Sequence, residues 1–301
     1  MTSPRRYFNL SADSDRWNRF GFRPGDIVIS TPPKAGTTLT QMLTALLVFD
    51  DPDLPASLDE LSPWLDMTAL AEDEVFTRLD AQTHRRFIKT HTPLDGIPER
   101  DDVVYLTIAR DPRDVFVSWQ HHFDNMDLDQ LFAFIDAAIG IEQVQQFLVP
   151  PPDDIGERFD LFVDSRDPTE FLSAAGLGHQ MQLQWDRRER PNVCSQHFTD
   201  VRADPVAAMG RIAAVLGLER STERLTELAA AADIGAMRSL AADRAPARGL
   251  FNDPAKFFRT GGSGEWRSIV TNDQLERYWE AVNSRATPEV VDWMHFGEAG
   301  A

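Results

Sequence analysis

The sequence predicts an α/β fold, a single domain with a central parallel β-sheet and helices on both faces. Short apolar runs at residues 27–29 and 103–109 are typical of buried parallel strands, and residues 86–93 fit a short buried strand that ends in polar residues. Basic residues follow each run, and a loop or helix comes next. Because the carboxyl ends of parallel strands meet at one edge of a sheet, we expect a ligand site lined by basic side chains there. The 301 residues suffice for one such domain, 1–301, and no internal repeat or long linker marks a boundary.

The first element of this fold is a strand, a tight loop and a helix between Asp26 and Phe49. Two prolines and a glycine in Thr31–Gly36 end the strand. From Thr37 the apolar residues recur with helical spacing, at Leu39, Met42, Leu43, Leu46 and Leu47. The helix N-terminus, with its unpaired N–H groups, therefore follows the loop directly, as in sites that bind phosphate.

Side chains of this loop reinforce the prediction of an anion site. Lys34 adds a positive charge, and Thr37 and Thr38 add hydroxyl donors. The pattern is close to GxxxxGK[ST], but the lysine precedes Gly36 by two residues and the leading glycine is missing. We interpret the loop as a phosphate site; the alternative is a polar strand-to-helix connection without a ligand.

The second and third strands also end in charged groups. Lys89 and His91 belong to the polar end of the strand at 86–93, and Arg110 follows the strand at 103–109. Pro112 suits the first turn of the next helix, and Ser118 lies about two turns from Arg110. These side chains are expected near Lys34.

The remaining chain carries fewer signals. Residues 1–24 are expected to be irregular, anchored by Trp17, Phe20 and Phe22. Residues 65–79 and 131–147 have helical patterns, 193–198 is a possible fourth strand, and 204–217 and 221–232 are predicted helices. Residues 126–178 are expected to enclose an acceptor. Thr271 and Gln274 form a capping box for a later helix.

Composition limits the classes of partner and location. The net charge of −18 argues against nonspecific binding to nucleic acid or to an anionic membrane. We expect Lys34, Lys89, Arg110 and Arg259 to converge on one cleft while acidic side chains spread over the outer surface. A single cysteine, Cys194, excludes an internal disulfide. The sequence has no apolar run of membrane-spanning length and no apolar signal core, so we expect no membrane span and a cytoplasmic location.

Four stretches, in this order, resemble the cytosolic sulfotransferase family. They are TPPKAGTT at 31–38, RFIKTHTP at 86–93, ARDPRDVFVSW at 109–119 and FRTGGSGEW at 258–266. The resemblance implies a P-loop-like fold and transfer of a sulfuryl group from 3′-phosphoadenosine 5′-phosphosulfate (PAPS), leaving PAP. The implied acceptor is a hydroxylated small molecule or lipid, and no metal is required. Arg267, Thr271 and Glu276 partly match the family's dimer segment, so a homodimer is possible.

The resemblance also implies roles for individual residues. His91 would be the general base, Lys34 would neutralise the bridging oxygen of the donor, and Lys89 would steady the sulfuryl oxygens. The implied donor-binding residues are Lys34, Ala35, Gly36, Thr37, Thr38, Arg110, Ser118, Phe198, Ile234, Phe258, Arg259, Thr260 and Gly261.

This sequence departs from the family at several donor positions. Leu39 and Ile234 stand where the family has aromatic residues, and Thr260 replaces a lysine. We therefore expect less aromatic stacking on adenine and weaker donor binding. His121 and His122 are expected on the helix surface or in the acceptor pocket.

Two other functions fit parts of the sequence. A P-loop kinase is disfavoured because Arg110 stands where an aspartate would hold magnesium. A nucleotide-binding protein without catalysis would not need both His91 and Lys34.

Overall fold

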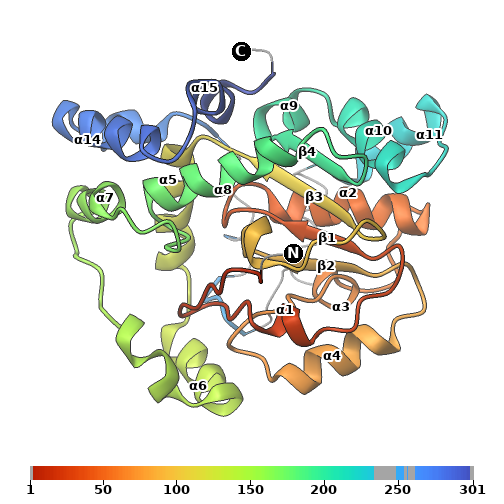
Figure 1. The fold of residues 1–301 in the computed structure, drawn as a ribbon, viewed down its shortest axis with the longest axis horizontal. Coiled ribbons are helices and arrows are strands. Elements are labelled where there is room, and N and C mark those ends of the chain that lie inside the picture. The colour runs from red at the N-terminus through yellow and green to blue at the C-terminus, as the bar shows by residue number, and fades with distance from the viewer. Residues whose placement is uncertain (1–2, 234–248, 254–255, 257–261, 299–301) are drawn as a thin grey trace.

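The computed structural model describes residues 3–233, 249–253, 256 and 262–298. Its centre is a sheet of four parallel strands, β1 (Ile27–Ser30), β2 (Phe87–Thr90), β3 (Val104–Ala109) and β4 (Val193–His197). The spatial order is β2-β1-β3-β4, which Figure 1 shows. In register, Ile27 of β1 lies opposite Phe87 of β2 and Val104 of β3. The predicted α/β fold with a central parallel sheet is confirmed.

Both faces of the sheet are buried, because alternate side chains of each strand enter different clusters. Ile27, Ile29 and Leu106 join a cluster that includes residues of α2 and α10. Val28, Ile88 and Tyr105 join a second cluster that includes Trp17 and residues of α4. Burial on both faces explains why β1 and β3 are nearly continuous apolar runs.

The helices cover the sheet and extend beyond it. The α-helices are α1 (Arg16–Arg19), α2 (Thr37–Phe49), α3 (Leu58–Leu61), α4 (Glu72–Ala81), α5 (Pro112–Asp124), α6 (Leu128–Ile139), α7 (Ile155–Asp164), α8 (Ala174–Arg187), α9 (Phe198–Ala203), α10 (Pro205–Leu216), α11 (Thr222–Ala231), α14 (Asn272–Asn283) and α15 (Pro288–Phe296). Three 3₁₀-helices are described, η1 (Leu94–Gly96), η2 (Ile141–Phe147) and η4 (Glu265–Ser268). Figure 1 shows that α6 lies apart from the layers around the sheet.

Several predicted boundaries are corrected by local chemistry. The fourth strand ends at His197, whose imidazole accepts from the N–H of Thr199 and caps α9, so Phe198 begins a helix. The helical pattern at 131–147 divides at Gly140, where φ is +83°. The pattern at 65–79 becomes helical only from Glu72. The capping box of Thr271 and Gln274 is confirmed.

The irregular N-terminal segment contains one short helix, α1, which the sequence analysis did not predict. Trp17, Phe20 and Phe22 pack together in the cluster of the second sheet face, as predicted for anchors.

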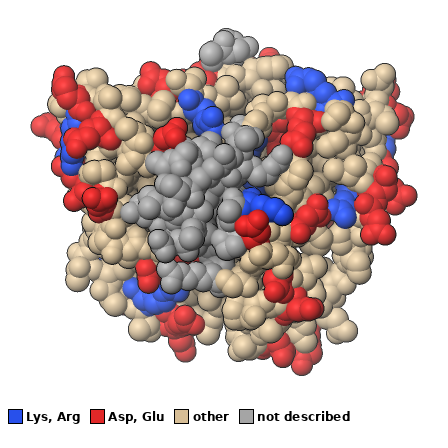
Figure 2. Space-filling model, turned by 180° about the vertical axis from the view of Figure 1, so that it is seen from behind, with Lys and Arg blue, Asp and Glu red and all other residues tan. Residues whose placement is uncertain are grey.

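Acidic side chains are spread over the face of the molecule that Figure 2 shows. On the face shown in Figure 2, aspartate and glutamate side chains lie around the whole outline, with lysine and arginine among them. This distribution agrees with the expectation that the acidic charge is spread over the outside.

Candidate functional site

The loop after β1 contains two residues with positive φ. Lys34 has φ of +61° and Gly36 has φ of +128°. A Cβ at Gly36 would lie 3.0 Å from side-chain atoms of both Ile108 and Phe198. Glycine is therefore required by conformation and by space, and it lets α2 begin directly after the loop. Gly36 and the first turn of α2 line a cavity of about 1050 Å³.

A hydrogen bond joins the two ends of this loop. The hydroxyl oxygens of Thr31 and Thr37 lie 2.6 Å apart. Thr37 and Thr38 both line the cavity. The N-cap is a glycine, which has no side chain to bond the first N–H groups of α2. The start of the helix is thus suited to an anion.

His91 follows β2 and is held in one orientation. Its Nδ1 lies 2.8 Å from the carbonyl oxygen of Thr31, so Nδ1 carries the hydrogen and donates it. In the neutral ring, Nε2 then keeps the lone pair. Burial and the charges of Lys89 and Lys34 lower the pKa of His91 to about 3. His91 lines the cavity as a neutral imidazole and can accept a proton.

Trp64 contacts both Lys89 and His91. The segment around Trp64 pairs with the edge of β2, and Trp64 lies opposite Lys89 in a parallel bridge. The Lys89 ammonium lies 4.3 Å from the centre of the Trp64 ring, and the His91 ring meets the same indole edge to face at 4.6 Å. Burial lowers the pKa of Lys89. The indole therefore fixes the two side chains relative to each other.

Asp66 holds Trp64 and the end of β2 in place through hydrogen bonds. Its carboxylate is fully buried and accepts hydrogen bonds from the indole N–H groups of Trp64 (2.7 Å) and Trp17 (2.9 Å). It also accepts from the hydroxyls of Thr90 and Thr92, both at 2.7 Å. Trp17, Trp64 and the end of β2 are thus joined by one acceptor.

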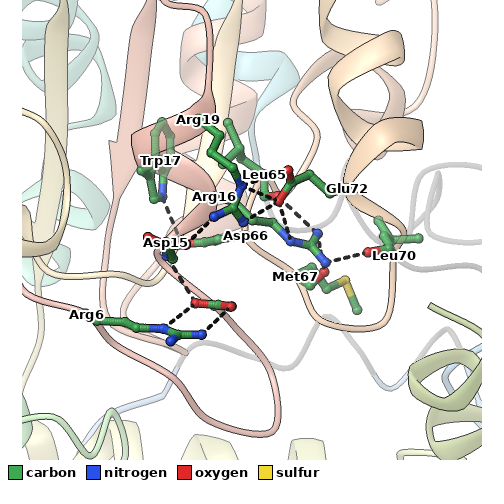
Figure 3. A network of polar contacts seen from close by, with 11 residues as sticks. Arg6, Asp15, Arg16, Trp17, Arg19, Leu65, Asp66, Met67, Leu70 and Glu72 are labelled. Atoms are coloured by element: carbon green, nitrogen blue, oxygen red, sulfur yellow. Dashed lines mark hydrogen bonds and ion pairs between the residues drawn. The ribbon is translucent and has the colours of Figure 1, made fainter. Parts of the chain in front are cut away.

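Arg16 holds a neighbouring segment of the chain through the polar contacts that Figure 3 shows. The buried guanidinium donates to the carbonyl oxygens of Met67 and Leu70, each at 2.8 Å. Met67 and Leu70 line the cavity. An irregular segment is thereby fixed without a helix or strand of its own.

Arg110 lies between the loop and the segment that precedes η4. Its guanidinium donates to the carbonyl oxygens of Lys34 (2.9 Å) and Gly262 (3.0 Å). It also stacks over the Phe198 ring, with 4.5 Å between Cζ and the ring centre. Arg110, Phe198 and Ser118 all line the cavity.

Helix α5 holds the start of the C-terminal segment in place. Arg113 forms a two-point ion pair with Asp111 and lies 3.9 Å from the centre of the Trp266 ring. Asp114 accepts from the N–H of Gly264 at 2.7 Å. Gly262 and Glu265 therefore join the cavity wall.

The cavity extends from these polar groups to an apolar part. Side chains from four segments line this part: the segment after α3, α6, η2 and residues 250–251. They are Met67, Leu131, Phe134, Phe147, Leu250 and Phe251. Residues 250–251 are tied to the start of α6, since the N–H of Asp127 donates to the carbonyl of Leu250 at 2.9 Å. The cavity thus has cationic and apolar parts.

Most predicted site residues meet around this one space. Those that line it are Lys34, Gly36, Thr37, Thr38, Lys89, His91, Arg110, Ser118 and Phe198. Ala35 is fully buried in the main core and does not line the cavity. Ile234, Phe258, Arg259, Thr260 and Gly261 lie outside the described residues.

The roles of Trp64, Asp66 and Arg16 were not predicted from the sequence, because partners of these side chains come from segments distant in the chain. The two adjacent histidines of α5, His121 and His122, were expected on the helix surface or in the acceptor pocket, and they lie in different environments. His121 is exposed, with Nε2 3.0 Å from a Glu265 carboxylate oxygen, whereas His122 lines the cavity.

Two kinds of feature are absent from the described residues. No group of three or more His, Cys, Asp and Glu side chains in this part of the chain is arranged to hold a metal ion. Among the helices of the described residues, none is both long enough and apolar enough to cross a membrane.

Comparison with known proteins gives a consistent result. Residues 24–291 match the model of the sulfotransferase domain family. Glycolipid sulfotransferases of Mycobacterium bovis and Mycobacterium tuberculosis are each 40% identical, over 100% of this chain and 97% of theirs. Sulfotransferase 1B1 of Mus musculus is 22% identical over 88% of this chain and 83% of its own.

Solved structures share the fold at lower identity. Mouse sulfotransferase SULT7A1 complexed with PAP has a TM-score of 0.68 and 19% identity, over 92% of this chain and 89% of its own. Retinol dehydratase in complex with retinol and PAP has a TM-score of 0.68 and 20% identity, over 92% and 87%.

Proposed function

The chain belongs to the sulfotransferase family, and from this premise we propose that it moves a sulfuryl group from PAPS to a hydroxyl of an amphipathic acceptor such as a glycolipid. The single observation that carries the proposal is the shared cavity of Lys34, Lys89 and His91. Two cations and a neutral imidazole suit a reaction in which an anionic leaving group departs and a hydroxyl loses its proton.

The phosphate groups of the donor would occupy the loop and the start of α2. Lys34, Thr37, Thr38 and the N–H groups of this helix would hold the 5′-phosphate. Ser118 and Arg110 would bind near the 3′-phosphate, and Phe198 would contact the adenine. PAP in the solved relatives agrees with this choice of donor.

The proton of the acceptor would move to His91. Its Nδ1–H is bound to the Thr31 carbonyl, so Nε2 is the nitrogen left to act as base. The acceptor oxygen would form a bond to sulfur as the bond from sulfur to the 5′-phosphate oxygen breaks. Lys34 would stabilise the charge on that leaving oxygen, and Lys89 the charge on the sulfuryl oxygens.

The apolar part of the cavity supports an acceptor with a lipid portion. Leu131, Phe134 and Phe147 line this part, and the mycobacterial relatives are glycolipid sulfotransferases. An acyl or isoprenoid chain would bury apolar surface against these residues while a sugar hydroxyl lies near His91.

The experiment combines purified protein with sulfur-labelled PAPS and three acceptor types: a glycolipid, its delipidated sugar and a small phenol. We expect labelled product with the glycolipid and much less with the sugar alone. Addition of EDTA should leave the reaction intact, whereas it would abolish a magnesium-dependent kinase reaction. The absence of transfer to every hydroxylated acceptor, with PAP binding retained, would refute the catalytic proposal.

His91→Asn is a matched variant for the proton step. Its side-chain amide can still donate to the Thr31 carbonyl, but it has no basic nitrogen. We expect turnover to fall about 100-fold or more while PAP binding stays near the wild-type value. Wild-type turnover in this variant would exclude His91 as the base.

A further inference from the structure

His122 is a half-buried side chain of the site that the proposed mechanism does not use. It lies on α5, one turn beyond Ser118, and it lines the same cavity. Its Nδ1 is 3.2 Å from the Nζ of Lys34. The imidazole packs between Trp119, at 5.4 Å between ring centres, and Phe251, at 5.0 Å.

The contact with Lys34 determines the hydrogen-bonding state of this ring. A lysine ammonium has donors and no acceptor, so Lys34 donates and Nδ1 of His122 accepts. The hydrogen of the neutral ring then sits on Nε2. Burial together with the charges of Lys34, Lys89 and His91 lowers the pKa of His122, which keeps the imidazole neutral.

A neutral acceptor has a specific advantage here. A carboxylate beside Lys34 would orient the ammonium but would also cancel the positive charge that attracts an anionic donor. A neutral imidazole satisfies one N–H of the ammonium and leaves its charge in place.

Lys34 is also held at its other end. Its backbone has a left-handed φ of +61°, and its carbonyl accepts from Arg110. The chain segment from Arg110 to His122 thus fixes both the backbone and the ammonium of one residue. Since Phe251 lines the apolar part of the cavity and contacts the His122 ring, this contact lies at the boundary between the cationic and apolar parts.

We propose that His122 is a positioning residue for Lys34, accepting a hydrogen bond at Nδ1 that directs the ammonium toward the reacting group. This inference rests on the proposed sulfuryl transfer. It assigns His122 no proton transfer, so its loss should lower the rate without removing the base.

Three substitutions at His122 separate the possible roles. His122→Asn keeps an acceptor near the position of Nδ1, His122→Gln moves it to the position of Nε2, and His122→Phe keeps the ring shape alone. We expect kcat of the Asn variant to stay within about threefold of wild type. The Gln and Phe variants should lose about tenfold to a hundredfold, as for one hydrogen bond to a charged group. The donor KM should change less than kcat, because Lys34 keeps its charge.

His121→Asn and His121→Phe are the matched controls. His121 is the adjacent residue, exposed and directed to Glu265, so both variants should retain wild-type kcat. Wild-type kcat in His122→Phe would overturn the proposal, and so would an Asn variant as slow as the Phe variant.

A measurement without turnover separates this proposal from the sulfotransferase proposal. Nitrogen NMR of the histidines should show His122 with its hydrogen on Nε2, and Lys34→Met should shift the His122 Nδ1 resonance. A His122 ring with its hydrogen on Nδ1, or one insensitive to Lys34→Met, would overturn the positioning role. Failure of every acceptor assay with this NMR signature present would refute only the proposed reaction.

Discussion

Replacing Asp66 with asparagine should both destabilise the protein and slow the reaction. The buried carboxylate accepts four hydrogen bonds, three of them at Oδ2 and one, from Trp64, at Oδ1. An asparagine has one acceptor oxygen, so its NH₂ group must face former donors. The cheaper orientation keeps the oxygen at Oδ2 and turns the NH₂ group toward the Trp64 indole N–H.

The expected loss follows from that orientation. One hydrogen bond to a charged group contributes about 1.5–3 kcal/mol, and two opposed buried donors remain. We therefore expect Asp66→Asn to lower the free energy of unfolding by at least about 2 kcal/mol. Because the released indole contacts Lys89 and His91, turnover of the folded variant should also fall.

Urea unfolding monitored by tryptophan fluorescence measures the first effect, and single-turnover sulfuryl transfer measures the second. Asp292→Asn is the control, since Asp292 is exposed on α15. Its stability should lie within about 0.5 kcal/mol of wild type. If Asp66→Asn unfolds at the wild-type urea concentration and keeps wild-type turnover, the proposed role of the Asp66 carboxylate is wrong.

Three further predictions concern the pH dependence, the loop and α5. The pKa of His91 in the free protein is lowered to about 3, so the imidazole stays unprotonated from pH 8 to 5, and kcat/KM should not fall through its protonation there. Bound donor anions would offset the lysine charges and raise the pKa of His91. The fall of kcat at acidic pH should therefore occur at higher pH than the fall of kcat/KM. The reverse order would contradict the electrostatic argument. Gly36→Ala should lower stability by about 1–3 kcal/mol and weaken PAP binding, whereas Gly217→Ala, at a left-handed position with open space, should affect stability alone. Arg113→Lys loses the two-point hydrogen bond to Asp111 and the contact with the Trp266 ring. Calorimetry should show a loss of stability of about 1.5–3 kcal/mol together with weaker PAP binding. Unchanged stability and binding would show that the two-point hydrogen bond is dispensable.

Sequence periodicity predicted the parts of the fold that local rules govern. The strands predicted at 27–29 and 103–109 are buried on both faces, so their apolar character is visible in the sequence. The position of Lys34, Lys89 and Arg110 around one cavity followed from parallel topology, which brings strand ends to one edge. Ser118 was placed by counting helical turns from Arg110.

Long-range hydrogen bonds explain what the sequence could not predict. Asp66 binds the Trp17 indole across 49 residues of chain, and Arg16 reaches Leu70 across 54. No local spacing signals such a partner, because irregular segments are fixed by contacts rather than by periodicity. The one available signal was a set of buried residue types, Trp, Asp and Arg, that are costly to bury unpaired.

The donor part and the acceptor part of the cavity are built from different kinds of structure. Strand ends and the first turn of α2 supply charge and N–H groups in a geometry that the sheet fixes. The acceptor part is built from α6, η2 and irregular segments, of which residues 67–70 depend on Arg16 and 250–251 on the start of α6. Changes in these segments would alter the preference among acceptors without disturbing the loop at residues 31–36. His122 lies where the two parts meet, since its ring contacts Phe251 and its Nδ1 contacts Lys34. Substitutions there should therefore change the rate of transfer and the preference among acceptors together, whereas substitutions of Leu131 or Phe147 should change the preference alone.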